Sequence, residues 1–112
     1  ALVKAMRIQE KASGVGFDWE NGDQVWDKVE EEIKEFKAEI QAETVNLKRK
    51  NEEFGDVLFS LINYARFQDI NPEEALERTN KKFIKRFQYL ERASKREGKS
   101  LVEMILSEMN IY

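Results

Sequence analysis

The spacing of the apolar residues is the feature that most restricts the fold of this chain. One Pro and five Gly interrupt its 112 residues, and between them apolar side chains recur every three or four positions. This period is typical of amphipathic helices and differs from the alternation of a half-buried strand. We therefore predict an all-α fold, a bundle of four to five helices. The length favours a single domain covering residues 1–112.

Capping residues and apolar periods place the individual helices. The predicted segments are residues 2–12, about 24–42, about 47–67, about 72–96 and a short helix after Ser100. Asn71 and Pro72 are an N-cap and a first-turn proline, a strong start signal for the fourth segment. Large apolar residues crowd the third segment after Asp56, so we expect it to be the central helix. On the fourth segment the predicted buried stripe is Leu76, Thr79, Phe83, Phe87 and Leu90.

Composition excludes several kinds of chemistry. The chain has no Cys and no His, so disulfides, thiolate nucleophiles, the usual zinc sites and imidazole catalysis are absent. A net charge of -3 argues against a nucleic acid polymer or an acidic membrane as partner. No apolar run is long enough for a membrane span, and the first ten residues are too polar for a signal peptide. We expect a cytoplasmic protein.

Two pairs of carboxylates stand out on neighbouring helices. Glu32 and Glu35 lie one turn apart on the second predicted helix, and Glu53 and Asp56 lie one turn apart on the third. If the two helices pack antiparallel, the four carboxylates can converge. Converging carboxylates repel one another unless they are protonated, paired or bound to a metal. Oxygen ligands without His or Cys favour Mg²⁺, with Mn²⁺ as a substitute.

A solvated acidic face is the alternative for the second helix. Lys28 and Lys34 could support such a face through ordinary pairs one turn away. The third helix is harder to explain in this way, because Asp56 precedes an apolar segment and has a poor preference for a helix interior. Gly55 also lowers helix stability by roughly 1 kcal/mol relative to Ala. Close approach of a partner or ligand would explain a glycine at this position.

A basic ridge follows on the fourth predicted helix. Lys82 and Arg86, four residues apart, run along one edge of the buried stripe. Arg and Lys are suited to phosphate oxygens, although the two residues could equally cover the core or pair with acids. Phe17, Trp19 and Trp26 are expected in a core or interface, and one of them, with Trp19 as our candidate, could stack on a base.

Four sequence blocks together resemble one family. The blocks are GVGFDW (14–19), KVEEEIKEF (28–36), EEFGDVLFSLINYAR (52–66) and NKKFIKRF (80–87). In this order they resemble the MazG family of nucleoside triphosphate pyrophosphohydrolases, which belongs to an all-α superfamily. The first block is most similar to the start of the C-terminal repeat of two-domain members. The resemblance thus implies that the chain is part of a longer protein.

The resemblance also implies roles for individual residues. Metal binding is implied for Glu32, Glu35, Glu53 and Asp56, and triphosphate binding for Lys82 and Arg86. Glu31 becomes a candidate for orienting or deprotonating the attacking water, and Arg49 a further phosphate candidate. The family's reaction cleaves a nucleoside triphosphate between its α and β phosphates, giving a monophosphate and pyrophosphate. Mg²⁺ would neutralise the triphosphate and activate water.

Other functions stay open at this point. Family members form homodimers or homotetramers through helix packing, and the large apolar side chains of this chain are compatible with that. Among enzymes, a narrower relative acting on dUTP, dCTP or phosphoribosyl-ATP is the nearest alternative. A non-catalytic helical dimerisation module is the alternative of another class. Neither the preferred base nor the choice between canonical and aberrant nucleotides follows from the sequence.

Overall fold

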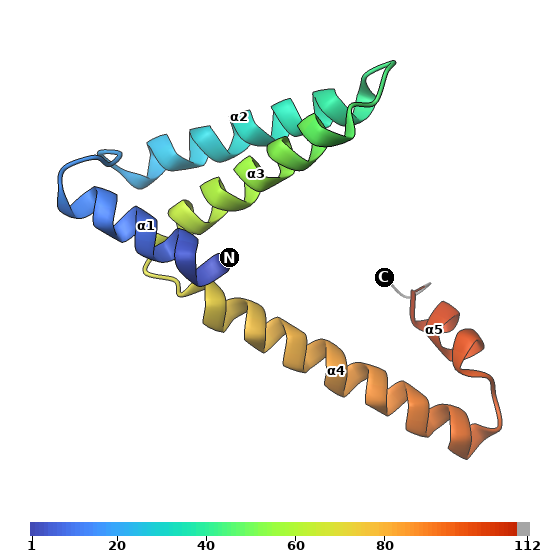
Figure 1. Ribbon diagram of the computed structural model, residues 1–112. Helices are drawn as coiled ribbons and strands as arrows, with labels where there is room; N and C mark the ends of the chain where they lie inside the picture. The colour runs from blue at the N-terminus through green and yellow to red at the C-terminus, as the bar shows by residue number, and fades with distance from the viewer. Residues whose placement is uncertain (110–112) are drawn as a thin grey trace. The chain divides into compact units, whose positions relative to one another are not determined.

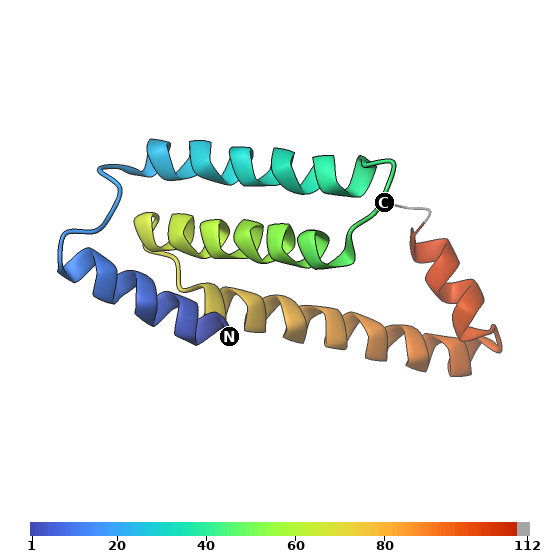
Figure 2. The ribbon, with the colours of Figure 1, turned by 45° about the horizontal axis from the view of Figure 1, so that its top comes forward.

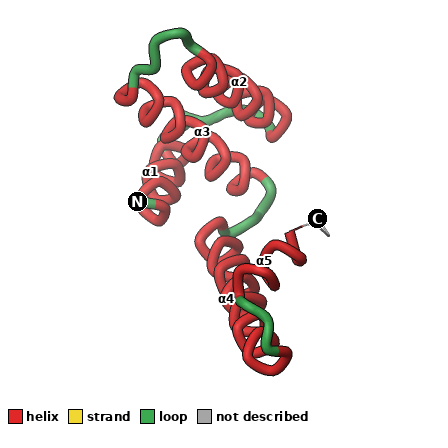
Figure 3. The backbone as a smooth tube through the Cα atoms, turned by 90° about the vertical axis from the view of Figure 1, so that its right-hand side faces the viewer, coloured by secondary structure: helices red, strands yellow, loops and turns green. Residues whose placement is uncertain are grey.

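The computed structural model describes residues 1–109, and these residues form helices and loops without a strand (Figures 1 and 3). The helices are α1 (Leu2–Gly14), α2 (Gly22–Gln41), α3 (Leu47–Phe67), α4 (Pro72–Glu97) and α5 (Leu101–Met109). This confirms the all-α prediction. The chain divides into two compact units, one covering Ala1–Glu73 and the other beginning at Glu74. No helix among the described residues is long and apolar enough to cross a membrane.

Side-chain caps explain where the helices begin. The Asn21 side chain accepts a hydrogen bond of 3.0 Å from the backbone N–H of Gln24, and Asn46 caps α3 in the same way. Helix α2 therefore begins at Gly22, two residues earlier than predicted, because Asn21 satisfies a backbone donor of the first turn. The predicted starts of α4 and α5 are confirmed by caps from Asn71 and Ser100.

In the first unit, α3 lies between α1 and α2 and runs antiparallel to α2 (Figure 2). Val25 and Val29 of α2 and Val57 of α3 are buried where these two helices pack, while the buried Ile62 of α3 lies beside residues of α1. Two aromatic contacts extend the seam, with ring centroids 5.4 Å apart for Phe36 and Phe54 and 5.0 Å apart for Trp26 and Tyr64. The apolar faces of α2 and α3 thus fix which of their polar side chains meet.

The second unit contains most of α4 followed by α5. Leu90 and Ala93 are buried, and an ion pair between Arg86 and Glu108 joins the two helices. Gly98 ends α4 with a φ of +68°, in the left-handed region that glycine adopts without steric cost.

The predicted buried stripe of α4 is wrong for most of its length in this chain. Leu76 is 53% exposed, Phe83 is 71% exposed and Phe87 is 36% exposed, while Leu90 alone of the stripe is buried. The physical reason is that an amphipathic pattern identifies a face that gains from burial, but within the second unit this face is covered only near Leu90. On α3 likewise, Leu58, Phe59 and Leu61 remain at least 40% exposed, although the helix is central in its unit.

The α2–α3 seam gives the first testable prediction. Val29 is fully buried, so replacing it by Ala removes two methyl groups and leaves a cavity. We expect V29A to lower the free energy of unfolding by about 2 kcal/mol, measured by urea denaturation. The matched control is V15A, because Val15 is 82% exposed and its truncation should change stability little. Equal effects of the two substitutions would contradict this packing scheme.

Candidate active site

Three carboxylates meet at the contact between α2 and α3. One oxygen each from Glu32, Glu35 and Glu53 lie within 4.8 Å of one another. Glu32 and Glu35 come from successive turns of α2, and Glu53 comes from the facing side of α3. The antiparallel packing of the two helices therefore brings both acids of the α2 pair and Glu53 of the α3 pair together across the interface.

Glu32 is the most deeply placed member of this cluster, with 6% of its surface exposed. Its Oε1 lies 2.9 Å from the Lys28 ammonium group, and its Oε2 is buried without a hydrogen-bond partner among the described residues. The Glu32 carboxylate, which accepts a hydrogen bond from Lys28, raises the pKa of that lysine. Lys28 thus offsets part of the negative charge, as the solvated-face alternative expected, but leaves one buried oxygen of Glu32 unpaired.

Glu53 experiences the repulsion of the cluster most directly. Its pKa is raised, first because its half-buried position removes solvent and then because Glu35, Asp56 and Glu32 carry like charges nearby. Its Oε2 is also buried without a hydrogen-bond partner among the described residues. A cation placed among these oxygens would remove both penalties.

Asp56 and Glu31 lie at the margin of the cluster. Asp56 is exposed and contributes no oxygen to the three-carboxylate group, although its charge acts on Glu53. Glu31 is exposed, and its carboxylate lies 3.5 Å from the Lys28 ammonium group. Apart from its chain neighbours and the backbone of its own helix, no atom of the described residues lies within 4 Å of the position that a Cβ at Gly55 would occupy. Packing within the described chain therefore does not require a glycine there.

The predicted phosphate ligands lie in different parts of the molecule. Arg49 of α3 is exposed, 4.0 Å from the Glu39 carboxylate of α2. Lys82 and Arg86 lie on α4 in the second unit, and both are exposed. The Arg86 guanidinium binds the Glu108 carboxylate, and this hydrogen-bonded contact lowers the pKa of Glu108.

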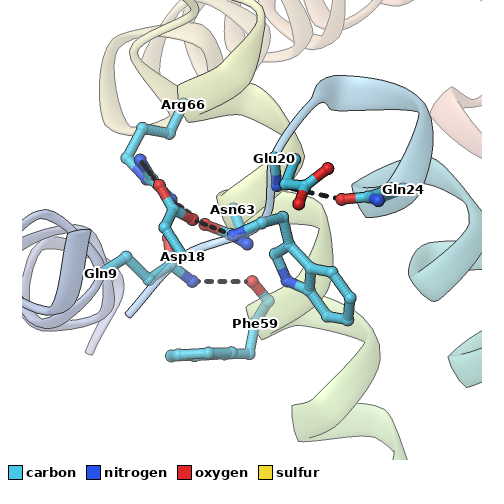
Figure 4. Close-up of polar contacts among 8 residues, drawn as sticks. Gln9, Asp18, Glu20, Gln24, Phe59, Asn63 and Arg66 are labelled. Carbon is cyan, nitrogen blue, oxygen red and sulfur yellow. Dashed lines mark hydrogen bonds and ion pairs between the residues drawn. The ribbon is translucent and has the colours of Figure 1, made fainter. Parts of the chain in front are cut away.

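Trp19 lines a pocket of about 410 Å³ in the first unit. The pocket lies among α1, the loop from Val15 to Asn21, and α3, and its polar members are joined by hydrogen bonds (Figure 4). Trp19 is a candidate from the sequence alone, whereas its polar neighbours Gln9, Asp18 and Arg66 are identified only in the structure. A polar Gln9 on the apolar face of the first helix was a signal that could have indicated this site.

The carboxylate cluster fits a divalent cation on two observations. Its donors are all carboxylate oxygens, which suit hard cations such as Mg²⁺ and Mn²⁺. Two of its oxygens, one from Glu32 and one from Glu53, are buried and lack hydrogen-bond partners among residues 1–109. Such oxygens are unfavourable in a folded protein unless a ligand satisfies them. Glu32, Glu35 and Glu53 are therefore the residues that would hold the ion.

The fold and the site together define a class of protein: an all-α domain with a cluster of carboxylates between two antiparallel helices. The family model for the MazG nucleotide pyrophosphohydrolase domain matches residues 21–90, which include the whole cluster. The chain belongs to this family.

Named relatives extend the similarity to the ends of the chain. It is 42% identical over 112 residues to the nucleoside triphosphate pyrophosphohydrolase/pyrophosphatase MazG of Thermotoga maritima, covering all of this chain and 42% of that protein. It is 38% identical over 109 residues to the nucleoside triphosphate pyrophosphohydrolase of Escherichia coli K12, covering 97% of this chain and 41% of the relative. It is also 55% identical over 58 residues to the uncharacterized protein YabN of Bacillus subtilis, covering 52% of this chain and 12% of the relative. The chain thus spans less than half the length of each relative.

The raised pKa of Glu53 gives a prediction about stability. The folded state holds the Glu53 proton to higher pH than the unfolded chain does, so stability falls as pH rises from the ordinary glutamate value through the raised one. In a chelator at pH 7, E53Q removes this penalty, and we expect its melting temperature to exceed that of the unmodified chain. At about pH 3, more than one unit below the ordinary glutamate pKa, the group is protonated in either state and the difference should vanish.

The control for this prediction is E30Q, because Glu30 is exposed on α2 and is not part of the carboxylate cluster. It should leave the melting temperature almost unchanged. A lower melting temperature for E53Q at pH 7, or an equal gain for E30Q, would show that the carboxylates do not repel one another as described.

Proposed function

We propose that this chain hydrolyses nucleoside triphosphates to a nucleoside monophosphate and pyrophosphate, with Mg²⁺ bound by Glu32, Glu35 and Glu53. The observation that carries the proposal is the meeting of these three carboxylates across α2 and α3, with two buried oxygens lacking partners among the described residues. Membership of the MazG family and the names of the relatives from Thermotoga maritima and Escherichia coli support the same reaction.

In this proposal the acidic residues have two roles, metal binding and activation of the attacking water. Glu32, Glu35 and Glu53 hold the ion, and Asp56, one turn after Glu53 and exposed, adds a ligand on the open side of the cluster. Glu31 is exposed beside the cluster and is our candidate for orienting or deprotonating the attacking water. Bound Mg²⁺ would supply charge neutralisation at the phosphates and a lowered pKa for water.

Basic residues provide candidate contacts to the phosphates. Lys82 and Arg86 lie four residues apart on an exposed face of α4, and Arg49 is exposed on α3. Arg86 already binds a carboxylate, that of Glu108, so its guanidinium is oriented for a planar oxyanion. A phosphate at Arg86 would replace Glu108, which is an exchange of one oxyanion partner for another.

The nucleoside end of the substrate is assigned to the pocket lined by Trp19. Trp19 is 44% exposed there, so its ring has a free surface on which a base can stack. We propose Trp19 as a base contact. A cytoplasmic location, where nucleoside triphosphates are abundant, remains our prediction for this reaction.

A second copy of the chain is the proposed partner. Apolar side chains remain exposed along α3 and α4, including Leu58, Leu61, Phe83 and Ile84, and their burial would stabilise an assembly. We propose a homodimer or homotetramer. F83K should dissociate it, because a charge would replace an apolar side chain that is 71% exposed in the single chain.

Light scattering during size exclusion measures this assembly. We expect a multiple of the 13.2 kDa chain mass before substitution and a smaller species for F83K. The control E77K changes the charge of an exposed α4 residue without removing an apolar side chain, and it should keep the original mass. A monomer before any substitution would contradict the assembly.

The proposed reaction is tested by incubating the chain with a panel of nucleoside triphosphates and Mg²⁺ and identifying the products. Monophosphate with pyrophosphate supports the proposal. Orthophosphate alone contradicts it, and no turnover favours a non-catalytic helical module. Cleavage of dUTP or dCTP alone, or of phosphoribosyl-ATP alone, would identify the narrower relatives instead.

Substitutions in the cluster sharpen this test. E53Q and D56N should each lower kcat about a hundredfold or more, because losing several kcal/mol of metal-dependent stabilisation has that effect. Their circular dichroism spectra should match that of the unmodified chain, and E30Q should retain its activity. Full activity in either variant would remove that residue from the site.

A further inference from the structure

The pocket lined by Trp19 has apolar walls and few polar atoms. Ile8, Phe17, Trp19 and Phe59 supply apolar surface, and Gln9 and Asn63 supply amide groups. Such a mixture is typical of small-molecule pockets, in which a few polar groups orient a flat apolar ligand. Asp18 and Arg66 also line the pocket, and they pair with each other, so the orientation of the two amides is the remaining question.

The amide of Gln9 is oriented by a backbone carbonyl. Its Nε2 donates a hydrogen bond of 2.9 Å to the Phe59 carbonyl oxygen (Figure 4). A carbonyl can only accept, so the nitrogen must face Phe59 and the Oε1 atom is left as an acceptor. Gln9 is 6% exposed, and this Oε1 is buried without a hydrogen-bond partner among the described residues. Gln9 Oε1 can therefore accept a hydrogen bond from a ligand in the pocket that Gln9 lines.

The amide of Asn63 is oriented by an arginine. Arg66 Nη2 donates a hydrogen bond of 2.8 Å to Asn63 Oδ1. A guanidinium has donors and no acceptor, so the Asn63 oxygen must face it. The Asn63 NH₂ group is then turned away from Arg66 and is available to a ligand in the pocket that this residue lines.

Arg66 is in turn held by Asp18. Two parallel hydrogen bonds join the side chains, from Arg66 Nη1 to Asp18 Oδ2 at 3.0 Å and from Arg66 Nη2 to Asp18 Oδ1 at 2.7 Å. The backbone N–H of Trp19 donates to the same Asp18 Oδ1 at 2.8 Å. The Arg66 guanidinium lowers the pKa of Asp18 to about 2, so the pair stays ionised at physiological pH. One carboxylate thereby fixes both the arginine and the residue that carries the aromatic ring.

We propose that Asp18 and Arg66 are positioning residues for a nucleobase: together they hold Trp19 at the pocket and keep the Asn63 NH₂ group available as a donor, while Gln9 Oε1 is the acceptor. This inference rests on the proposed function, because a nucleoside triphosphate is the substrate considered. It adds the way in which the chain recognises the base.

Beside the Asp18–Arg66 ion pair, which also lines the pocket, the two amides present one donor and one acceptor to a ligand. The hydrogen-bonding edges of adenine, guanine, cytosine and uracil each offer at least one N–H donor and one acceptor. These two amides therefore recognise the presence of a base more strongly than its identity. The expected ligands are nucleotides with an intact hydrogen-bonding base edge, and a sugar phosphate without a base should bind more weakly.

The test compares AMP with ribose 5-phosphate, two ligands that differ by the base. Isothermal titration gives the ratio of their affinities, in which effects on the shared sugar phosphate cancel. N63D should lower this ratio about tenfold, because an aspartate has no N–H to donate. Its new carboxylate can still accept from Arg66, so the melting temperature should not fall. A ratio unchanged in N63D would overturn the proposal.

Exchanging the charges of Asp18 and Arg66 shows whether this pair positions the base-binding groups or only stabilises the fold. D18N and R66Q should each lower the ratio of the affinity for AMP to that for ribose 5-phosphate. R78Q is the control, because it removes an exposed ion pair on α4, and it should leave this ratio unchanged. The double variant D18R/R66D can re-form the ion pair, but the carboxylate introduced at position 66 would accept rather than donate. It would therefore turn the Asn63 NH₂ group toward itself and the Asn63 oxygen toward the pocket. We expect the double variant to recover melting temperature without recovering the ratio. Recovery of both would show a merely structural pair and overturn the proposal.

Failure of the proposed reaction is recognised separately. If no triphosphate is hydrolysed but AMP binds more tightly than ribose 5-phosphate and the variants behave as stated, the base site is supported and the hydrolase is not. If triphosphates are hydrolysed but the two ligands bind equally well, the hydrolase is supported and the base site is overturned.

Discussion

The repulsion among Glu32, Glu35 and Glu53 is the interaction on which the rest of the site depends. Their oxygens lie within 4.8 Å of one another, a separation at which like charges near a protein surface oppose each other by several kcal/mol. The apolar seam around Val29 and Val57 holds α2 and α3 together despite this repulsion. Apolar packing in the seam thus keeps the three carboxylates close together although they repel one another. A bound cation would relieve this repulsion, so the cluster favours cation binding.

Helix α3 links this cluster to the proposed base pocket. Glu53 and Asn63 are ten residues apart on the same helix, which corresponds to roughly 15 Å along its axis. This separation is on the scale of an extended nucleotide with its phosphates. In this proposal α3 carries both the metal ligand Glu53 and the base donor Asn63. The spacing of these two residues along the helix then sets the distance between the phosphate end and the base end of a bound substrate.

Local geometry explains which parts of this arrangement could be predicted from the sequence. The pairs Glu32 with Glu35 and Glu53 with Asp56 follow from helical spacing, and the antiparallel packing of α2 and α3 follows from their short connection. Contacts between distant segments could not be predicted in this way. The Asp18–Arg66 pair joins residues 48 positions apart, and Asp56 lies outside the three-carboxylate group through details of side-chain placement. The exposed Phe83 shows that an apolar stripe indicates a need for cover without identifying what provides it.

Anomalous diffraction from crystals grown with Mn²⁺ locates the bound ion without reference to activity. We expect an anomalous peak between α2 and α3, within coordination distance of carboxylate oxygens from Glu32, Glu35 and Glu53. A structure with well-ordered Mn²⁺ bound at other residues, and with these three carboxylates paired to lysine or arginine instead, would contradict it.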